Sequence, residues 1–155
     1  MSDARTIVQL LIDRGETVAT AESLTAGMVT AVLTTVPGSS AVVRGGLVVY
    51  ATDLKASLAG VPAELLAEHG AVHPEVALAL AAGARMVCGT DWGIGLTGVA
   101  GPDPQDGVAP GRVYFAIAGP AGTTCHELDL TGGRHAVRSA SVVAALRALR
   151  AALTG

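Results

Sequence analysis

The stretch Thr20–Gly27 reads TAESLTAG and combines an acid, hydroxyl groups and small residues. Small and β-branched residues precede it from Thr17, after a break at Gly15, which is typical of a strand. Apolar residues follow it at helical spacing, at positions 28, 29, 32 and 33. The pattern therefore predicts that Ser23 lies at a strand-to-helix turn, around which the rest of the chain is organised.

Two interpretations of Ser23 fit such a turn. The first N–H groups of a helix lack partners within the helix and can receive negative charge, which suits a nucleophilic serine. The same N–H groups also favour a serine as an N-cap, with no catalytic role. This stretch alone favours the cap, because caps far outnumber nucleophiles.

The composition limits the class of protein. The chain has 155 residues, half of them hydrophobic, but only 3% aromatic and 15% charged, with 20 glycines. We expect one α/β domain whose core is built from Ala, Val and Leu and whose helices approach a sheet closely. A net charge of −3 and few aromatic rings argue against binding to nucleic acid.

The N-terminal residues and the cysteines predict a cytoplasmic protein without a metal. Residues 1–15 lack the pattern of a signal peptide, and the uncharged run 23–43 is broken by Gly27 and a Pro-Gly pair, so no membrane span is expected. Cys88 and Cys125 belong to no CxxC or Cys/His cluster, which predicts neither a zinc site nor a disulfide framework.

Periodicity and turn residues predict the order of the elements. The expected helices cover about 3–14, 25–36, a short segment capped by Thr52 or Asp53, 62–70, 73–87 and a last helix from about 134 with an apolar stripe at 142, 146, 149 and 153. The expected strands lead into Ser23 and cover 47–50, 92–97, 113–118 and 123–130, the last two as a hairpin. The run 47–50 is typical of a buried parallel strand.

The segment Gly98–Pro110 has no periodicity and contains several Gly and Pro residues. Such a long irregular segment in a small domain favours a binding role. The glycines from 95 to 101 are spaced GxxGxxG, which does not match a dinucleotide fingerprint. Thr97 is the one hydroxyl side chain at this edge, and a plain turn at the end of a strand remains the alternative.

Lys55 is the only lysine, because the other nine basic residues are arginines. A lysine that is desolvated can lose its proton, whereas an arginine cannot, so Lys55 is the sole candidate for a neutral amine base. The alternative is an ordinary surface lysine. Tyr50 ends the preceding strand, so both side chains can point over the carboxyl edge of the sheet; the alternative for Tyr50 is a half-buried strand residue.

Arg134 and Arg138 lie one turn apart at the start of the last helix. Two cations there oppose each other and the helix dipole, which favours an anion bound between them. Solvated arginines or partners for Glu127 and Asp129 are the alternative. The four histidines fit no catalytic arrangement, and no GxSxG motif is present, so a serine enzyme here would need another base.

Taken together, the motifs resemble one family along residues 3–153. They are TAESLTAG, PGSSAVVRGG, YATDLK, GAVHPEVA, GLTGVAGPD, PGRVY and GGRHAVR, in the order seen in the C-terminal domain of CinA, the nicotinamide-nucleotide amidase family. The resemblance implies a three-layer α/β/α sandwich with a mixed, mainly parallel sheet. Residues 1–155 are expected to form one such domain, without the further N-terminal domain of some members.

The resemblance also implies an activity: hydrolysis of nicotinamide mononucleotide to nicotinic acid mononucleotide and ammonia, with no metal or cofactor. It assigns the nucleophile to Ser23, its activation to Lys55 and Tyr50, and substrate binding to Thr97 at the glycine edge that continues with Gly98. Arg134 or Arg138 would meet the substrate's anion. The backbone of Thr25, Ala26 and Gly27 belongs to the turn expected to hold the oxyanion.

Three positions depart from the family pattern. Leu24 and Ala26 stand where many members have Cys and Gly, and His73 stands where Ser is frequent. A methyl group at position 26 is expected to crowd the oxyanion side of the turn. His73 is expected to start a helix.

The expected partners are the small nucleotide substrate and further copies of the chain in a homo-oligomer, with no membrane. Two other functions remain open: a non-catalytic nucleotide-binding or scaffold module of the same fold, and an amidase for a different small amide.

Overall fold

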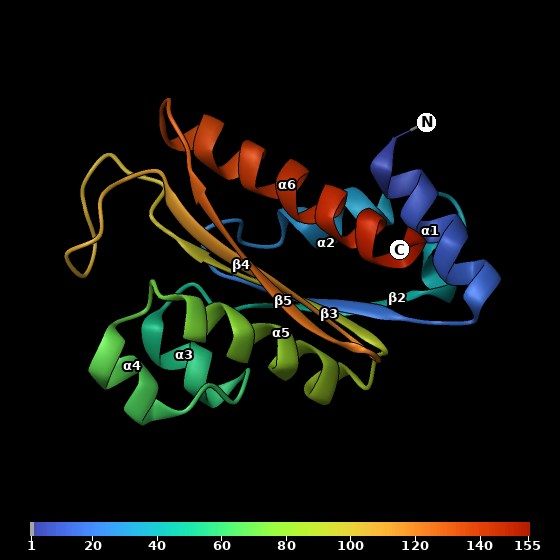
Figure 1. The fold of residues 1–155 in the computed structure, drawn as a ribbon, viewed down its shortest axis with the longest axis horizontal. Coiled ribbons are helices and arrows are strands. Elements are labelled where there is room, and N and C mark those ends of the chain that lie inside the picture. The colour runs from blue at the N-terminus through green and yellow to red at the C-terminus, as the bar shows by residue number, and fades with distance from the viewer. Residues whose placement is uncertain (1) are drawn as a thin grey trace.

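A five-stranded sheet lies at the centre of the computed structural model, which describes residues 2–155 (Figure 1). The strands run in the order β2-β1-β3-β4-β5. β1 pairs in parallel with β2 and β3, whereas β4 pairs antiparallel with β3 and β5. Their bounds are β1 Val18–Glu22, β2 Val43–Val48, β3 Trp92–Gly98, β4 Arg112–Gly119 and β5 Gly122–Asp129.

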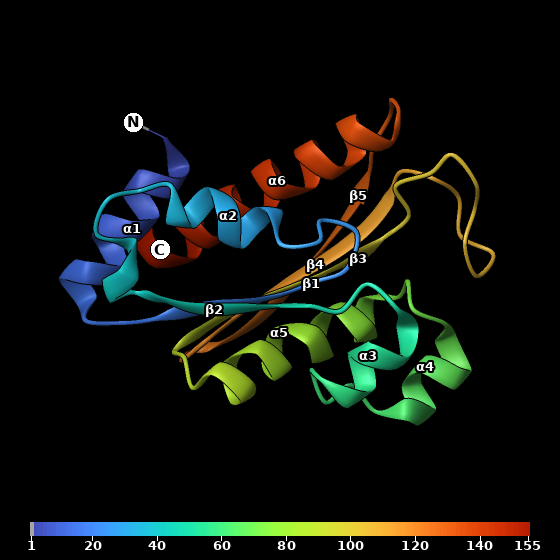
Figure 2. The same cartoon turned by 180° about the vertical axis from the view of Figure 1, so that it is seen from behind.

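Helices cover both faces of the sheet (Figures 1 and 2). One face carries α1 (Asp3–Arg14), α2 (Met28–Thr34) and α6 (Arg134–Thr154), and the other carries α3 (Thr52–Ser57), α4 (Ala63–His69) and α5 (Pro74–Cys88). The predicted three-layer α/β/α architecture with a mixed sheet is thereby confirmed. Parallel pairing is confined to β1, β2 and β3. The predicted hairpin of β4 and β5 is one antiparallel pair, and β4 forms a second with β3.

Small residues let α5 lie directly on the sheet. A Cβ atom added at Gly93 would lie 2.2 Å from the carbonyl oxygen of Ala81, and one added at Gly95 would lie 2.4 Å from the backbone nitrogen of Ala81. Every residue of β1 and β3 is buried, as expected for central strands covered on both faces. The abundance of Gly and Ala in the sequence therefore reflects a close contact between helix and sheet.

The second strand differs from the prediction. It covers Val43–Val48 instead of 47–50, includes both glycines, and lies at the edge of the sheet with alternating burial. A Cβ atom at Gly46 would lie 2.2 Å from Thr30 Oγ1 and 2.7 Å from Thr20 Oγ1. The glycine is thus part of the strand because two threonine hydroxyl groups pack against it, a contact that local propensity cannot reveal.

The helices agree with the prediction to within about one residue at their ends, except α2, which covers Met28–Thr34 instead of about 25–36. The stripe expected on α6 is buried at 142, 146, 149 and 153. His73 is the N-cap of α5, as predicted, and its Nδ1 accepts the N–H of Glu75. The short helix α3 is present, but its N-cap is Ala51, without a side-chain hydrogen bond, so the predicted capping by Thr52 or Asp53 is wrong.

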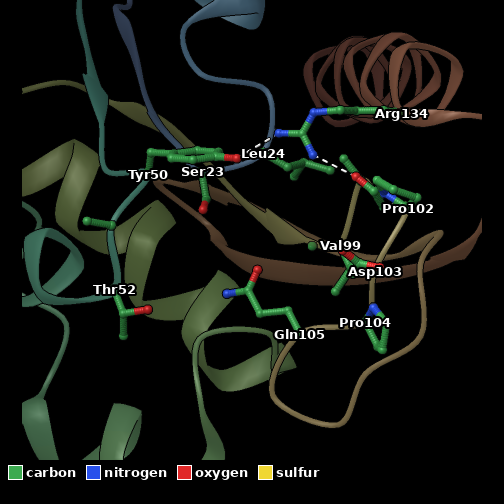
Figure 3. A pocket seen from close by; sticks show the side chains of 14 residues that line it. Ser23, Leu24, Tyr50, Thr52, Val99, Pro102, Asp103, Pro104, Gln105 and Arg134 are labelled. Atoms are coloured by element: carbon green, nitrogen blue, oxygen red, sulfur yellow. Dashed lines mark hydrogen bonds between the residues drawn. The ribbon is translucent and has the colours of Figure 1, made fainter.

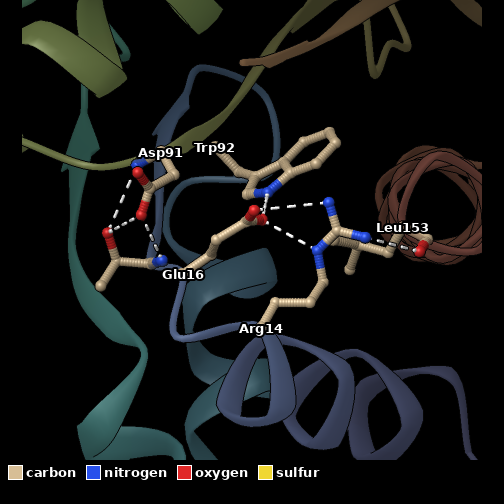
Figure 4. A network of polar contacts seen from close by, with 6 residues as sticks. Arg14, Glu16, Asp91, Trp92 and Leu153 are labelled. Atoms are coloured by element: carbon tan, nitrogen blue, oxygen red, sulfur yellow. Dashed lines mark hydrogen bonds and ion pairs between the residues drawn. The ribbon is translucent and has the colours of Figure 1, made fainter. Parts of the chain in front are cut away.

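The carboxyl ends of β1, β2 and β3 meet at one edge of the sheet, where a cavity opens (Figure 3). At the opposite ends of β1 and β3, a polar network connects the strands to α1 and α6 (Figure 4). Glu16 accepts hydrogen bonds from Trp92 Nε1 and Arg14, and these donors hold the pKa of its carboxyl group below the usual value. Arg14 also donates to the carbonyl of Leu153, and Asp91 accepts from the backbone N–H of Thr17.

None of the helices within residues 2–155 is long and apolar enough to cross a membrane. The uncharged run 23–43 instead forms the turn after β1, the helix α2 and a 3-10 turn, Ser39–Ala41.

We expect Gly46→Ala to lower the free energy of unfolding by about 1–3 kcal/mol, because the added methyl group displaces Thr30 and Thr20. Gly45→Ala is the matched control in the same strand, since its Cβ atom would meet only Cys88 Sγ at 3.7 Å. Urea unfolding of the two variants measures the difference. Equal stability of the two variants would contradict the role assigned to Gly46.

Candidate active site

A cavity of about 480 Å³ lies at the carboxyl edge of the sheet (Figure 3). The turn after β1 contributes Ser23, the segment after β2 contributes Tyr50, and α6 contributes Arg134. The irregular segment after β3, for which the sequence predicts a binding role, forms the remaining wall. The complete lining is Ser23, Leu24, Tyr50, Ala51, Thr52, residues 98–105 and Arg134.

Ser23 begins the turn that was predicted from TAESLTAG. Its backbone N–H donates to the carbonyl of Leu96 at 3.1 Å, and its carbonyl accepts the N–H of Ala26 at 3.1 Å. Ala26 (φ 48°) and Gly27 (φ 96°) both adopt left-handed backbone, which turns the chain back toward α2. Ala26 therefore occupies a conformation that glycine adopts at lower cost.

The N-cap interpretation of Ser23 is wrong, because Glu22 satisfies the first N–H groups of α2. The helix begins at Met28 instead of about Thr25, and its N-cap, Gly27, has no side chain to donate or accept. The Glu22 carboxylate accepts the N–H of Val29 at 2.9 Å and that of Thr30 at 3.1 Å.

Hydroxyl groups complete the environment of the fully buried Glu22. The Thr25 hydroxyl donates to it at 2.7 Å and the Thr20 hydroxyl at 2.9 Å, and the Thr30 hydroxyl lies within 3.1 Å. The carboxylate has donors on both oxygens, as a buried charge requires. Thr25, predicted to bind substrate, is itself buried and directs its hydroxyl to Glu22, so only its backbone N–H can serve that role.

The side chain of Lys55 is 1% exposed, which excludes the alternative of a surface lysine. Its Nζ lies 2.9 Å from Ser23 Oγ and donates to the carbonyl of Val49 at 2.8 Å and that of Tyr50 at 3.3 Å. Burial lowers the pKa of the amine from 10.5 to about 8, while the charge of Asp106 acts to raise it. The amine is therefore available in its neutral form near neutral pH, in contact with a hydroxyl group.

Tyr50 lines the cavity, but its hydroxyl group makes no hydrogen bond with Lys55. The side chain is 56% exposed, and its hydroxyl accepts a hydrogen bond from Arg134 Nη2 at 2.7 Å. Arg134 Nη1 donates to the carbonyl of Gly101 at 2.7 Å (Figure 3). The contact of Tyr50 with the amine is made by its backbone carbonyl.

The two arginines of α6 have different positions. Arg134 lines the cavity, whereas Arg138 Nε donates to the carbonyl of Leu24 at 2.8 Å and supports the turn after Ser23 from outside. Of the two arginines, Arg134 is therefore the one that faces the cavity. The structure does not place the two guanidinium groups around one anion, because each is engaged by a different backbone carbonyl.

Thr97 and Gly98 end β3 beside the site. Gly98 lines the cavity, but Thr97 is buried and its hydroxyl donates to the carbonyl of Ala71 at 2.6 Å. Thr97 thus connects the sheet to the segment between α4 and α5.

The turn after β1 offers backbone donors. The N–H groups of Leu24, Thr25 and Gly27 have no hydrogen-bond acceptor within residues 2–155. Unpaired N–H groups next to a serine are the usual elements of an oxyanion site. Within the same residues, no group of three His, Cys, Asp or Glu side chains is arranged to hold a metal ion.

Sequence reasoning missed three residues around the site: Glu22, Gln105 and Asp106. The roles of Glu22 and Asp106 arise from contacts across the fold, with Thr30 and Ala71 respectively. The Asp-Gly pair at 106–107 was the one available signal, because it is a preferred sequence for a tight hairpin turn.

The titration of Lys55 can be observed directly. In protein labelled with ¹⁵N-lysine, the only lysine gives one side-chain signal, and we expect its midpoint near pH 8 because burial disfavours the charged amine. NMR against pH measures it, with the urea-unfolded chain as the reference. A midpoint near 10.5 would contradict the desolvated state of the amine.

Glu22→Gln should lower the free energy of unfolding by about 2–4 kcal/mol, because the amide NH₂ would face the N–H donors of Val29 and Thr30. Glu64→Gln makes the same chemical change at an exposed position of α4 and should be close to neutral. Denaturant unfolding compares the two. If both were neutral, the capping role of Glu22 would be disproved.

The comparisons with known proteins agree along nearly the whole chain. The family described as "CinA C-terminal domain" matches residues 2–153. A "CinA-like protein" from Anaeromyxobacter sp. (strain K) is 50% identical over 148 residues, which cover 95% of this chain and 36% of the relative. A "CinA-like protein" from Frankia casuarinae is 46% identical over 149 residues, which cover 96% of this chain and 34% of the relative. The chain thus spans about a third of the length of these relatives.

Solved structures share the fold. A CinA superfamily protein from Klebsiella pneumoniae 700603 superposes with a TM-score of 0.94 at 31% identity, over 98% of this chain and 96% of the other. The competence/damage inducible protein CihA from Agrobacterium tumefaciens gives 0.89 at 34% identity, over 100% of this chain and 98% of the other. From its sequence, its fold and the extent of these matches, the chain belongs to the CinA C-terminal domain family.

Proposed function

We propose that the protein is an amidohydrolase in which Ser23 is the nucleophile and Lys55 its general base. The observation that carries this proposal is the 2.9 Å contact between Ser23 Oγ and a buried amine with a pKa of about 8. A serine needs an adjacent base to become nucleophilic, and a desolvated lysine can supply one at neutral pH. At pH 7 about one tenth of such an amine is neutral.

The reaction begins when neutral Lys55 takes the proton of Ser23 Oγ as this oxygen attacks the carbonyl carbon of a carboxamide. The negative charge that develops on the carbonyl oxygen is received by unpaired N–H groups of the turn, for which Leu24, Thr25 and Gly27 are the candidates. The C–N bond then breaks, and ammonia leaves with the proton held by Lys55. Water attacks the acyl-serine with Lys55 again as base, which releases the carboxylic acid and restores the site.

The proposed substrate is nicotinamide mononucleotide, which yields nicotinic acid mononucleotide and ammonia. Membership of the family and the resemblance of the site motifs support this choice. The cavity adds a physical argument, because it places a cation, Arg134, at a distance from the reacting pair and so can hold an anionic substituent such as a phosphate (Figure 3).

Tyr50 has a defined place in this proposal. Its hydroxyl accepts a hydrogen bond from Arg134, so a substrate anion that draws the guanidinium away frees this hydroxyl beside the cavity. The freed Tyr50 can then assist proton transfer to the leaving ammonia. Tyr50 and Arg134 would in this way couple binding of the anion to the chemistry.

The test is release of ammonia from nicotinamide mononucleotide. We expect Ser23→Ala and Lys55→Met each to lower kcat/KM by about 10³-fold or more, because each removes one member of the nucleophile–base pair. Lys55→Arg should fail as well, since a guanidinium does not deprotonate. Ser57→Ala, an exposed serine on the helix of Lys55, is the matched control and should retain activity.

The pH dependence follows from the same base. Because only the neutral amine accepts a proton, kcat/KM should rise with pH up to about 8 and then level off.

The other two functions predict different results. If the wild-type protein and Ser23→Ala both bind the nucleotide saturably and neither releases ammonia, the non-catalytic module is favoured. A panel of other small amides distinguishes a different amidase.

A further inference from the structure

The loop Val99–Pro110 has a tightly folded tip. The N–H of Gln105 donates to the carbonyl of Val108 at 3.0 Å, and the N–H of Val108 donates back at 2.8 Å. Between them, Asp106 (φ 50°) and Gly107 (φ 76°) both adopt left-handed backbone. This is the two-residue Asp-Gly turn of a β-hairpin, which gives the tip a defined shape although the rest of the loop is irregular.

The tip is fastened to the segment between α4 and α5. Asp106 Oδ2 accepts the N–H of Ala71 at 3.1 Å. At the neighbouring Gly70 (φ 75°), a Cβ atom would lie 3.0 Å from the Cβ of Asp106, so the aspartate lies directly on the glycine backbone. The carbonyl of Ala71 accepts the Thr97 hydroxyl, so this residue is bonded both to the loop and to β3.

The same contact orients the wall of the cavity. Gln105 precedes the turn and lines the cavity, and its side-chain amide points into it (Figure 3). Because Gln105 is bonded through its backbone to Val108, its position depends on where the turn is anchored. The anchor is the single carboxylate of Asp106.

Asp106 also acts on the reacting pair by its charge. The groups in contact with the Lys55 amine are uncharged: the Ser23 hydroxyl and two backbone carbonyls. Among residues 2–155, Asp106 is the charged side chain whose field favours the protonated amine against burial. The buried carboxylate of Glu22, next to Ser23, is occupied by its own donors from α2 and the threonines.

We propose that Asp106 is a positioning residue that fastens the 98–110 loop over the site, so that Gln105 faces the substrate and Lys55 lies in the field of a carboxylate. This inference rests on the proposed function for its kinetic consequence, but not for its structural one. The tip of the loop is held by one hydrogen bond, in which Asp106 Oδ2 accepts the N–H of Ala71, whereas its start is held by Arg134 at the carbonyl of Gly101.

Two variants separate the anchor from the charge. Asp106→Asn keeps an oxygen that accepts the Ala71 N–H and removes only the charge, whereas Asp106→Ala removes both. We expect the NMR midpoint of Lys55 to fall in both variants, because each loses the charge that favours the protonated amine. Hydrogen exchange at the Ala71 amide should accelerate about tenfold or more in Asp106→Ala and remain close to wild type in Asp106→Asn.

Kinetics provide a third readout. Asp106→Ala should raise KM for nicotinamide mononucleotide about tenfold, while Asp106→Asn should keep KM and shift the rise of kcat/KM to lower pH. A merely structural aspartate would not move this pH limb. Glu64→Gln is the matched control and should alter neither quantity.

The proposal is overturned if both Asp106 variants keep the wild-type Lys55 midpoint and the wild-type Ala71 exchange rate. These two measurements need no turnover, so they test the anchor even if the wild-type protein releases no ammonia, an outcome that would refute the proposed function alone. If Asp106→Ala fails to fold, Asp106→Asn still decides the charge effect, and an unchanged midpoint in that variant overturns the proposal.

Discussion

The burial of one amine against one hydroxyl group is the constraint on which the site depends. Burial removes water from the Lys55 amine and lowers its pKa to about 8. Its Nζ forms hydrogen bonds with Ser23 Oγ and two backbone carbonyls instead. Such a position requires that the ends of β1 and β2 and the short helix α3 be fixed relative to one another. The three-layer fold supplies that rigidity because each element packs on a common sheet.

A second buried charge fixes the other half of the pair. Glu22 lies directly before Ser23 and binds the first N–H groups of α2, so the serine is released from the capping role that its sequence position favoured. The hydroxyl is then free to face Lys55. Gly46 belongs to the same arrangement, since its missing side chain makes room for the threonines around Glu22.

The cavity divides its chemistry between two regions. Ser23, bonded to the Lys55 amine, lines it together with a turn that offers unpaired N–H groups, while Arg134 and the Tyr50 hydroxyl form a second polar pair in the lining. This separation suits a substrate with a neutral reacting group and a distant anion. The loop that carries Asp106 forms another wall of the cavity, and the charge of Asp106 acts to raise the pKa of the Lys55 amine.

The sequence by itself determined the layers of the fold and predicted which residues form the candidate site. Periodicity predicted most helices and the strands β3, β4 and β5, because amphipathic patterns and Gly or Pro breaks are local signals. The sequence also singled out Lys55, as the only lysine, and the turn at Ser23, from the strand and helix patterns on either side of it. Local signals failed at β2, whose glycines read as a break although they pair with β1 as an edge strand.

Only the tertiary structure decided which polar groups form hydrogen bonds with one another. The packing of distant segments determines that Glu22 rather than Ser23 caps α2. It also determines that the Thr97 hydroxyl bonds the carbonyl of Ala71 and that Arg134 lines the cavity. Hydrogen bonds and desolvation act over a few ångströms in space, whatever the separation along the chain. A sequence pattern names the candidate groups, but their partners are fixed by the assembled fold.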